Sequence, residues 1–364
     1  MENQYKLRLD KIEEVLDSWL PRAPDLLWTQ KIFEIPAANG AGAIHQELVK
    51  SLSDPARDLL DRGGKRWRPL LMLLAAEALA GEQGAKAALP LVPLVEFCHN
   101  ASLIHDDIED SSDKRRGKPA IHLIYGTDTA INSGSFLYFL PLACLEAGVS
   151  EFSAETKCDI RETWGLYMRK LHLGQAMDIT WHRDFYSLPE IPEYEEMCRN
   201  KTGCLAGMAA ALAVNCVRDC PDAGRRDLSD NIAGKLEEGA EKLGVGFQIL
   251  DDVRNLCAGV PGKKRGDDIV EGKKSLPVLL YLHKFPEKRE FTASCFHAAR
   301  SAGTEAPEIE ELIQAMQKTG VVEEARNRGA QLIGESREIF GRIPFVDAEA
   351  GSLLQGLVDF ITDV

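Results

Sequence analysis

The chain has 364 residues, of which 45% are apolar and 27% charged, so it can build a sizeable core and is neither a low-complexity nor a collagen-like sequence. Its 57 acidic residues outnumber its 43 basic residues, which gives a formal net charge of -14. Because this charge repels polyanions, we expect no nucleic-acid partner, and any anionic ligand must meet a local basic cluster or a metal ion.

The N-terminal segment predicts a helix followed by an irregular connector. Apolar residues recur at helical spacing from Leu7 to Leu20, where Pro21 ends the pattern. Residues 21–45 contain three prolines and an Asn-Gly-Ala-Gly run, so they predict a connector. We therefore divide the chain into this segment, 1–45, and a single helical domain, 46–364. The apolar stripe suits an arm that packs on a partner subunit, and solvent-facing mobility remains the alternative.

Strand signals are nearly absent from the rest of the chain, and apolar residues recur at intervals of three and four. The predicted helices cover residues 66–80, 90–110, 127–147, 153–180, 193–217, 227–257 and 275–284, with shorter ones to 363. Residues 90–110 and 203–217 are apolar around most of their circumference, which places them inside a bundle. The sequence predicts an all-α fold, a large helical bundle around a central apolar cavity.

Cysteine usage and hydropathy indicate where the protein functions. Nine cysteines, an odd number without a paired framework, are typical of reduced thiols in the cytoplasm. The charge-free runs 129–145 and 202–217 fall short of the roughly 18 residues of a membrane span and contain Ser, Asn and Gly. We expect no transmembrane segment.

Two acidic clusters each follow an apolar helical stretch. Asp106, Asp107 and Asp110 lie near the end of one predicted inner helix, and Asp251 and Asp252 near the end of another. A solvated acidic face is the ordinary explanation for such spacing, but solvated charge seldom begins at the end of an apolar helix. If the two ends face each other, they form a cavity with carboxylates at its rim, where Mg²⁺ would offset their repulsion.

Basic residues cluster near both acidic pairs despite the acidic total. The segments are GGKRWRP at 63–69, KRRG at 114–117, KTG at 201–203 and the lysines at 263, 264, 273 and 274. Glycine permits close backbone approach, and arginine binds phosphate oxygens with two nitrogens. Each segment alone has an ordinary reading as a helix entry or a solvated turn. Together with the acidic pairs and the apolar interior, they predict an amphiphilic substrate with a diphosphate head.

These motifs occur in the order GGKRWRP, HDDIEDSSDKRRGKP, HLGQAMDI, KTG, FQILDDVRN and GDDIVEGKKSLP. In this order and spacing, over about residues 45–300, the chain resembles the trans-isoprenyl diphosphate synthases, or polyprenyl synthetases. Within that family it looks most like the geranylgeranyl diphosphate synthases of the eukaryotic type. The resemblance implies a helical bundle, usually dimeric or a higher homo-oligomer.

The resemblance also assigns roles to residues of this chain. It places the ligands of Mg²⁺, with three ions expected, on Asp106, Asp110 and Asp251, supported by Asp107 and Asp252. It places isopentenyl diphosphate against Lys65, Arg68, His99 and Arg116. It places the allylic diphosphate against Arg115, Lys201, Thr202, Gln248, Lys273 and either Lys263 or Lys264. The second acidic motif ends in Asn255, which weakens the case for a third carboxylate there.

The expected reaction is a metal-triggered ionisation, condensation and elimination. Charge on the departing diphosphate is stabilised electrostatically, the isopentenyl double bond attacks the allylic cation, and a proton is lost to the diphosphate. Product length follows from geometry: Ala101 and Ser102 are small and lie about 7 Å or less before Asp106 along a helix axis. Close helix packing explains small residues equally well.

Without a bulky residue at that depth we expect a geranylgeranyl product. The alternatives are a longer C25–C40 synthase and a non-catalytic partner subunit of a heteromeric synthase. A terpene cyclase fits less well, because Lys65, Arg68 and Arg116 imply a second diphosphate.

Overall fold

The computed structural model describes residues 2–34, 46–148, 151–220, 230–257 and 265–362. Across these ranges the regular structure is helical, apart from two short antiparallel strands. The predicted all-α fold class is therefore confirmed. Contacts group the chain into two compact units: unit 1 comprises 1–164, 209–233 and 344–357, and unit 2 comprises 165–208, 234–343 and 358–364.

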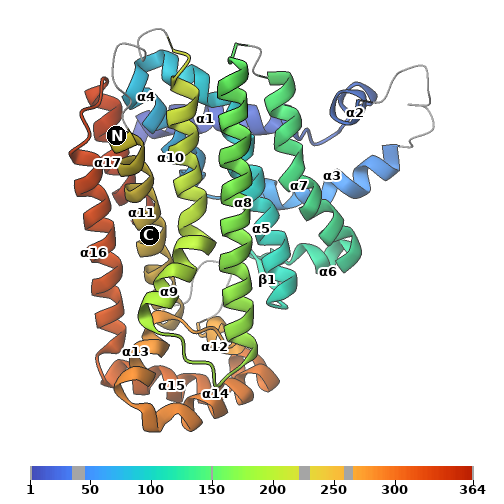
Figure 1. Cartoon of the computed structure of the whole chain (residues 1–364). Helices are drawn as coiled ribbons and strands as arrows, with labels where there is room; N and C mark the ends of the chain where they lie inside the picture. Colours follow the sequence, from blue (N-terminus) through green and yellow to red (C-terminus); the bar gives the residue numbers. More distant parts are fainter. Residues whose placement is uncertain (1, 35–45, 149–150, 221–229, 258–264, 363–364) are drawn as a thin grey trace. The chain divides into compact units, whose positions relative to one another are not determined.

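Unit 1 begins with α1 and contains the predicted inner helix of the first acidic cluster (Figure 1). Its elements are α1 (Glu2–Trp19), α2 (Leu26–Phe33), α3 (Gln46–Asp61), α4 (Trp67–Ala88), η2 (Leu89–Leu91), α5 (Val92–Glu109), β1 (Lys114–Arg115), β2 (Lys118–Pro119), α6 (Ile121–Tyr125) and α7 (Thr127–Gly148). Helix α5 packs along α7, and α3 packs against α7 as well. The burial of Leu94, Val95 and Phe97 confirms that α5 is an interior helix.

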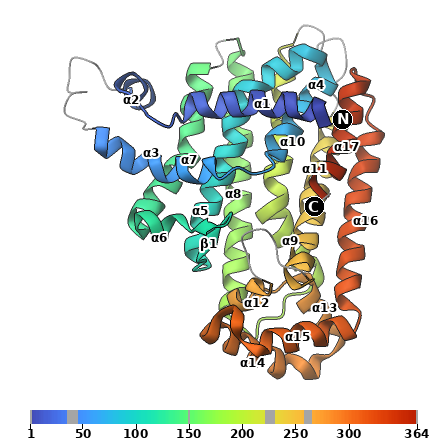
Figure 2. The ribbon, with the colours of Figure 1, turned by 180° about the vertical axis from the view of Figure 1, so that it is seen from behind.

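Helix α1 packs within its own unit, against α4 and α5 (Figure 2). Ile12, Leu16 and Leu20 are fully buried, and the Tyr5 hydroxyl donates to the Leu353 carbonyl at 2.7 Å. The apolar stripe is thus covered by unit 1 itself, while Leu7 remains 57% exposed. The sequence left open whether this stripe packs on a partner subunit or faces solvent. Most of it does neither, because it is buried within unit 1.

The connector predicted over residues 21–45 contains a helix that the sequence analysis missed. Asp25 caps α2, since its carboxylate accepts the Trp28 N–H at 2.7 Å. The Trp28 indole in turn donates to the Trp19 carbonyl at 2.9 Å, so α2 is held against the end of α1. An aspartate before an apolar run is a helix-start signal, and the nearby prolines obscured it. Residues 35–45 lie outside the described part of the chain.

The boundary between the units runs through helices. It divides α8 (Ala154–Arg183), α10 (Cys204–Val217), α11 (Asp230–Cys257) and α17 (Ala348–Thr362). Unit 2 also contains α9 (Ile191–Cys198), η3 (Arg199–Gly203), α12 (Asp267–Glu271), α13 (Leu276–Lys284), η5 (Pro286–Lys288), α14 (Arg289–Ala302), η6 (Gly303–Glu305), α15 (Pro307–Lys318) and α16 (Val321–Gly341).

Two predicted helices differ from the observed ones. The helix predicted over 66–80 continues to Ala88, with a kink where Ala80 and Gly81 leave helical geometry. The helix predicted over 193–217 is divided into α9, η3 and α10, and η3 is a π-helical turn. Single π-helical turns inside α-helices occur frequently at functional sites.

One helical stretch, residues 67–109, is long and apolar enough to meet the composition of a membrane span, with a mean hydropathy of 1.4 in its most apolar window. Of that window, 67% is buried, as in a core helix. Among the described residues, neither 129–145 nor 202–217 meets the same criterion. The long apolar stretch is therefore explained by burial.

Candidate active site

The first acidic cluster lies at the C-terminal end of α5, in unit 1. Helical geometry continues to Asp110, whose N–H donates to the Asp106 carbonyl at 2.8 Å. Asp106 and Asp110 are therefore one turn apart and share a face of the helix, as the spacing predicts. Both residues are partly exposed, but the two carboxylate oxygens of Asp110 are themselves buried.

Asp107 has a different role from its two neighbours. Its side chain is 1% exposed, and its Oδ1 accepts the Arg115 Nε at 2.8 Å. The same guanidinium reaches Asp106 Oδ2 at 3.1 Å. Arg115, on strand β1, is thus fixed against the acidic end of α5 by a buried carboxylate. Removal of one partner of such a buried pair is costly, because the other charge stays buried.

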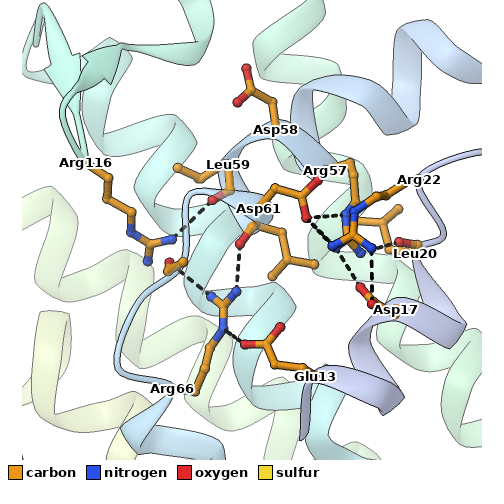
Figure 3. Close-up of polar contacts among 12 residues, drawn as sticks. Glu13, Asp17, Leu20, Arg22, Arg57, Asp58, Leu59, Asp61, Arg66 and Arg116 are labelled. Atoms are coloured by element: carbon orange, nitrogen blue, oxygen red, sulfur yellow. Dashed lines mark hydrogen bonds and ion pairs between the residues drawn. The ribbon is translucent and has the colours of Figure 1, made fainter. Parts of the chain in front are cut away.

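The residues that the resemblance assigns to isopentenyl diphosphate also fall in unit 1. Arg68 is 8% exposed and lies with Nη1 3.4 Å from the His99 Nε2. Arg116 donates to the Leu59 carbonyl at 3.2 Å, at the end of α3 (Figure 3). Lys65 is partly exposed in the segment between α3 and α4.

Arg66 is a member of this basic segment that the sequence analysis passed over. Its guanidinium binds Glu96 at 2.9 Å, the Leu60 carbonyl at 2.7 Å and Glu13 of α1 at 2.8 Å, the last as Figure 3 shows. Its φ of 47° lies in the left-handed region. Arg66 therefore shapes the turn between Lys65 and Arg68. A sequence signal existed, since Arg66 lies within GGKRWRP, but its acidic partners are distant in sequence.

Four guanidiniums of unit 1 act on His99, although two of them, Arg66 and Arg115, are also paired with carboxylates. The pKa of His99 lies well below its ordinary value, first because of burial and then because of Arg68, Arg116, Arg66 and Arg115. Burial is also the largest cause that lowers the pKa of Arg116 to about 10. A neutral His99 among cationic guanidiniums describes a site that favours an anionic ligand.

The two predicted chain-length residues lie on α5, before Asp106. Ala101 is fully buried, and Ser102 is partly exposed, with its hydroxyl donating to the His99 carbonyl at 2.8 Å. Their influence on product length stays a prediction.

The second acidic cluster lies on α11, in the part of that helix that belongs to unit 2. Asp252 is 6% exposed and accepts from Gln248 Nε2 at 2.9 Å and from the Tyr194 hydroxyl at 2.7 Å. Gln248 Oε1 accepts the Thr202 hydroxyl at 2.8 Å. Burial raises the pKa of Asp252, and the charge of Asp251 acts in the same direction. Asp252 is thus a buried member of a polar network, and Asp251 is its more exposed neighbour.

Lys201 and Thr202 lie in the π-helical turn η3. The Lys201 ammonium binds Asp178 of α8 at 2.5 Å, and the Asp178 side chain is 6% exposed. Gly174, one turn before Asp178, permits the close approach of α8 and η3, since a Cβ there would lie 2.3 Å from the Lys201 nitrogen. Asp178 lies within the HLGQAMDI motif, yet the sequence analysis assigned it no role.

The predicted lysines after α11 differ in their surroundings. Lys273 binds Glu271 at 2.5 Å, whereas Lys263 and Lys264 lie outside the described residues. The neighbouring Lys274 is 2% exposed and donates to the carbonyls of Trp181 and Gly272 at 3.2 and 3.1 Å. Its contacts make Lys274 a structural residue.

Asn255, which ends the second acidic motif, has a structural role. It is 2% exposed, and its backbone carbonyl accepts the Gly266 N–H at 3.1 Å. Its side-chain oxygen faces the Asp268 N–H at 3.4 Å. Asn255 therefore anchors the start of α12, where a charged aspartate is not required.

The donor set of each unit fits magnesium chemistry. Within the part of the chain that the structure describes, no group of three or more His, Cys, Asp or Glu side chains is close enough to form a closed metal site. Asp106 and Asp110 instead offer hard carboxylate oxygens on one helical face in unit 1, and Asp251 offers one in unit 2. Mg²⁺ is commonly held by one or two carboxylates, with water and substrate phosphate completing its shell.

Comparison with known proteins identifies the class. The polyprenyl synthetase family model matches residues 49–316. A geranylfarnesyl diphosphate synthase of Aeropyrum pernix is 31% identical over 324 residues, covering 86% of this chain and 94% of that protein. A geranylgeranyl diphosphate synthase of Methanosarcina mazei is 36% identical over 238 residues, covering 64% of this chain and 67% of that protein.

Solved structures agree with this comparison. The crystal structure of a geranylgeranyl pyrophosphate synthetase from Pyrococcus horikoshii has a TM-score of 0.75 and 27% identity, covering 97% of this chain and 99% of that one. The chain belongs to the polyprenyl synthetase family. It is a prenyltransferase that elongates isoprenyl diphosphates, which confirms the enzyme class predicted from the motifs.

Proposed function

We propose that the protein condenses isopentenyl diphosphate with an allylic diphosphate and releases geranylgeranyl diphosphate. The observation that carries this proposal is the placement of Arg68 against His99 and of Arg115 against Asp106, at the acidic end of α5. An anion-binding cluster and a carboxylate pair on one helix suit two diphosphates, one of which arrives with metal ions. The reaction requires that the acidic ends of α5 and α11 face a common apolar cavity, and this arrangement is part of the proposal.

Two separate groups of residues bind the two substrates. Lys65, Arg68, His99 and Arg116 bind the diphosphate of the homoallylic substrate and orient its double bond. Arg115, Lys201, Thr202, Gln248 and Lys273 bind the allylic diphosphate, with Lys263 or Lys264 contributing from the segment outside the described residues. The positions of Arg115 on Asp107 and of Lys201 on Asp178 support this division, because both cations are already fixed.

Asp106, Asp110 and Asp251 would hold magnesium, with three ions proposed. The metal would act as a Lewis acid that neutralises the charge of the leaving diphosphate. As the allylic C–O bond breaks, the oxygens of Thr202 and Gln248 stabilise the developing cation by their dipoles. The isopentenyl double bond forms the new C–C bond, and the proton released goes to the departing diphosphate. Asp252, buried with Tyr194, positions Gln248.

The product length has a second candidate. The A. pernix relative is a geranylfarnesyl diphosphate synthase, which favours a C25 product as the alternative within the C25–C40 range. A non-catalytic partner subunit is disfavoured, because both acidic pairs are present in this chain.

We also propose that the protein is a cytoplasmic homodimer. All nine cysteines are free, as in a reducing compartment. Helix α7 presents Ile131 and Phe139 to the surface, 46% and 61% exposed, and exposed apolar residues on one helix suit a subunit interface.

The deciding experiment combines the purified chain with isopentenyl diphosphate, a labelled allylic diphosphate and Mg²⁺. Chromatography of the dephosphorylated products gives the chain length directly. A C20 product is expected with geranyl or farnesyl diphosphate as the primer. A C25 or longer product would replace the geranylgeranyl assignment, and absence of any elongated product would contradict the proposed function.

A further inference from the structure

Arg62 follows the last residue of α3, and its side chain is almost fully enclosed. Only 1% of that side chain is exposed. Its Nε and Nη2 bind the two carboxylate oxygens of Asp58, one turn earlier, at 3.1 and 3.2 Å. A planar guanidinium bound to a carboxylate by two nitrogens has a fixed orientation.

The remaining nitrogen of Arg62 holds the hairpin formed by β1 and β2. Its Nη1 lies 3.1 Å from the Arg115 carbonyl and 2.9 Å from the Pro119 carbonyl. These carbonyls belong to opposite strands, since Arg115 pairs with Lys118 and Lys114 pairs with Pro119. One side chain therefore holds both strands against the end of α3.

The turn of this hairpin has an unfavourable sequence for its conformation. Arg116 and Gly117 are its two central residues, with φ of 53° and 76°. Two positive φ values define a tight hairpin turn that favours Asn or Asp at the first position. An arginine there is strained, and such strain persists only where surrounding contacts fix it. The bonds from Arg62 supply that constraint beside the turn.

The end of α3 also binds the arginines near the substrate. The Leu59 carbonyl accepts a hydrogen bond from Arg116, as Figure 3 shows, and the Leu60 carbonyl accepts one from Arg66. The carbonyls at the end of a helix form the negative end of its dipole, so guanidiniums bind there readily. Those of Leu59 and Leu60 also accept the N–H groups of Arg62 and Gly63, at 3.3 and 3.2 Å. The C-terminus of α3 is thus the common support of the hairpin and of the Lys65–Arg68 segment.

We propose that Arg62, fixed by Asp58, is a positioning residue that presents Arg115 and Arg116 to the two diphosphates. The inference rests on the proposed function, because it assigns Arg62 a task in substrate binding. Arg62 contacts backbone carbonyls and Asp58, and acts through the hairpin. Its fork geometry is essential, because a lysine ammonium cannot bind two carboxylate oxygens and two carbonyls in one plane.

The test compares Arg62→Gln and Arg62→Lys with the wild-type enzyme in steady-state kinetics. Both variants should raise KM for isopentenyl diphosphate and for the allylic diphosphate roughly ten- to a hundredfold, with a much smaller change in kcat. Hydrogen exchange should become faster at the amides of residues 114–118. If Arg62 acted only through its charge, Arg62→Lys would behave as the wild type, which would overturn the proposal.

Arg8→Ala is the matched control. Arg8 makes an equivalent two-nitrogen pair with Glu77, at 2.7 Å for both bonds, and touches neither the hairpin nor the basic segment in any contact described. It should leave both KM values and the exchange at 114–118 unchanged. Wild-type KM values in Arg62→Gln would overturn the positioning role while leaving the proposed function intact. An inactive wild-type chain would instead contradict the proposed function, and the exchange measurement would still test the support of the hairpin.

Discussion

The carboxylates at the end of α5 divide by their position on the helix. Asp107 is buried and bound to Arg115, whereas Asp106 and Asp110 lie one turn apart on another face. Metal binding is therefore proposed for Asp106 and Asp110, and structural support for Asp107. This distinction predicts different results for substitutions at adjacent positions.

Asp106→Ala, and separately Asp251→Ala, should lower kcat roughly a thousandfold or more, because each removes electrostatic stabilisation from the leaving diphosphate. The measurement is product formation at saturating Mg²⁺, with circular dichroism to show that the helices persist. Asp113→Ala, an exposed aspartate in the same segment, is the control and should retain wild-type turnover. Near-full turnover in Asp106→Ala would remove the metal assignment.

His99 gives a pH dependence with a defined sign. Burial and the charges of Arg68, Arg116, Arg66 and Arg115 lower its pKa, so the folded protein keeps it neutral where the unfolded chain binds a proton. The contribution of His99 to the free energy of unfolding is complete above the pKa of about 6.5 in the unfolded chain, and it is lost as the pH falls below that value. When the pH is lowered from 7.5 to 5.5, the free energy of unfolding of the wild type should fall by about 1 kcal/mol more than that of His99→Gln. Thermal denaturation across that range measures this difference, and parallel curves would contradict it.

At the scale of the element, the π-helical turn η3 depends on glycines of its neighbours. Gly174→Ala should destabilise the protein by about 1–3 kcal/mol through overpacking against the Lys201 backbone, and should lower activity because Lys201 and Thr202 move. Gly165→Ala on the same helix is the matched control, since the nearest atom to its Cβ is 3.7 Å away. The control should be neutral or slightly stabilising. Melting temperature and initial rate are the two measurements, and equal effects in both variants would contradict the packing argument.

The helices were predictable where their apolar periodicity is long. The expected ranges 90–110 and 153–180 correspond closely to α5 and α8. The π-helical turn was not predictable, because it depends on close contacts of Gly174 and Gly203 with other helices, and spacing in sequence carries no such information.

The same reason separates the predicted site residues from the missed ones. Asp106, Lys65 and Lys201 were predicted as site residues because their motifs combine charge with glycine or with a neighbouring acid, and their roles stay a prediction. Arg62 and Asp178 are single charged residues whose partners lie in other segments, so no local pattern distinguishes them from surface charges.

At the scale of the whole molecule, the length of the product depends on the space available to the growing chain. Ala101→Phe should shorten the product towards C15, because an aromatic ring about 7 Å before Asp106 would stop growth there. Since Ala101 is fully buried, this change also risks overpacking, and Ser102→Phe is the second variant. Chromatography gives the product distribution and thermal denaturation reports the packing cost. An unchanged distribution in two folded variants would contradict the proposed depth.

The proposed homodimer makes a separate prediction. Phe139→Glu places a charge on the exposed apolar face of α7 and should convert a dimer into a monomer in light-scattering measurements. Leu7→Glu, on the 57% exposed side of α1, is the control and should leave the mass unchanged. A monomeric wild-type protein would contradict the proposal.

Along the chain, four of the five boundaries between the two compact units fall within helices, after residues 164, 208, 233 and 357 of α8, α10, α11 and α17. Each of these cuts would break consecutive backbone hydrogen bonds and expose new helix ends. The units are consequently unsuited to separate expression or to exchange between relatives as modules. Chimeras of this enzyme should instead be joined in loops, such as residues 184–190 between α8 and α9, so that every long helix comes from one parent.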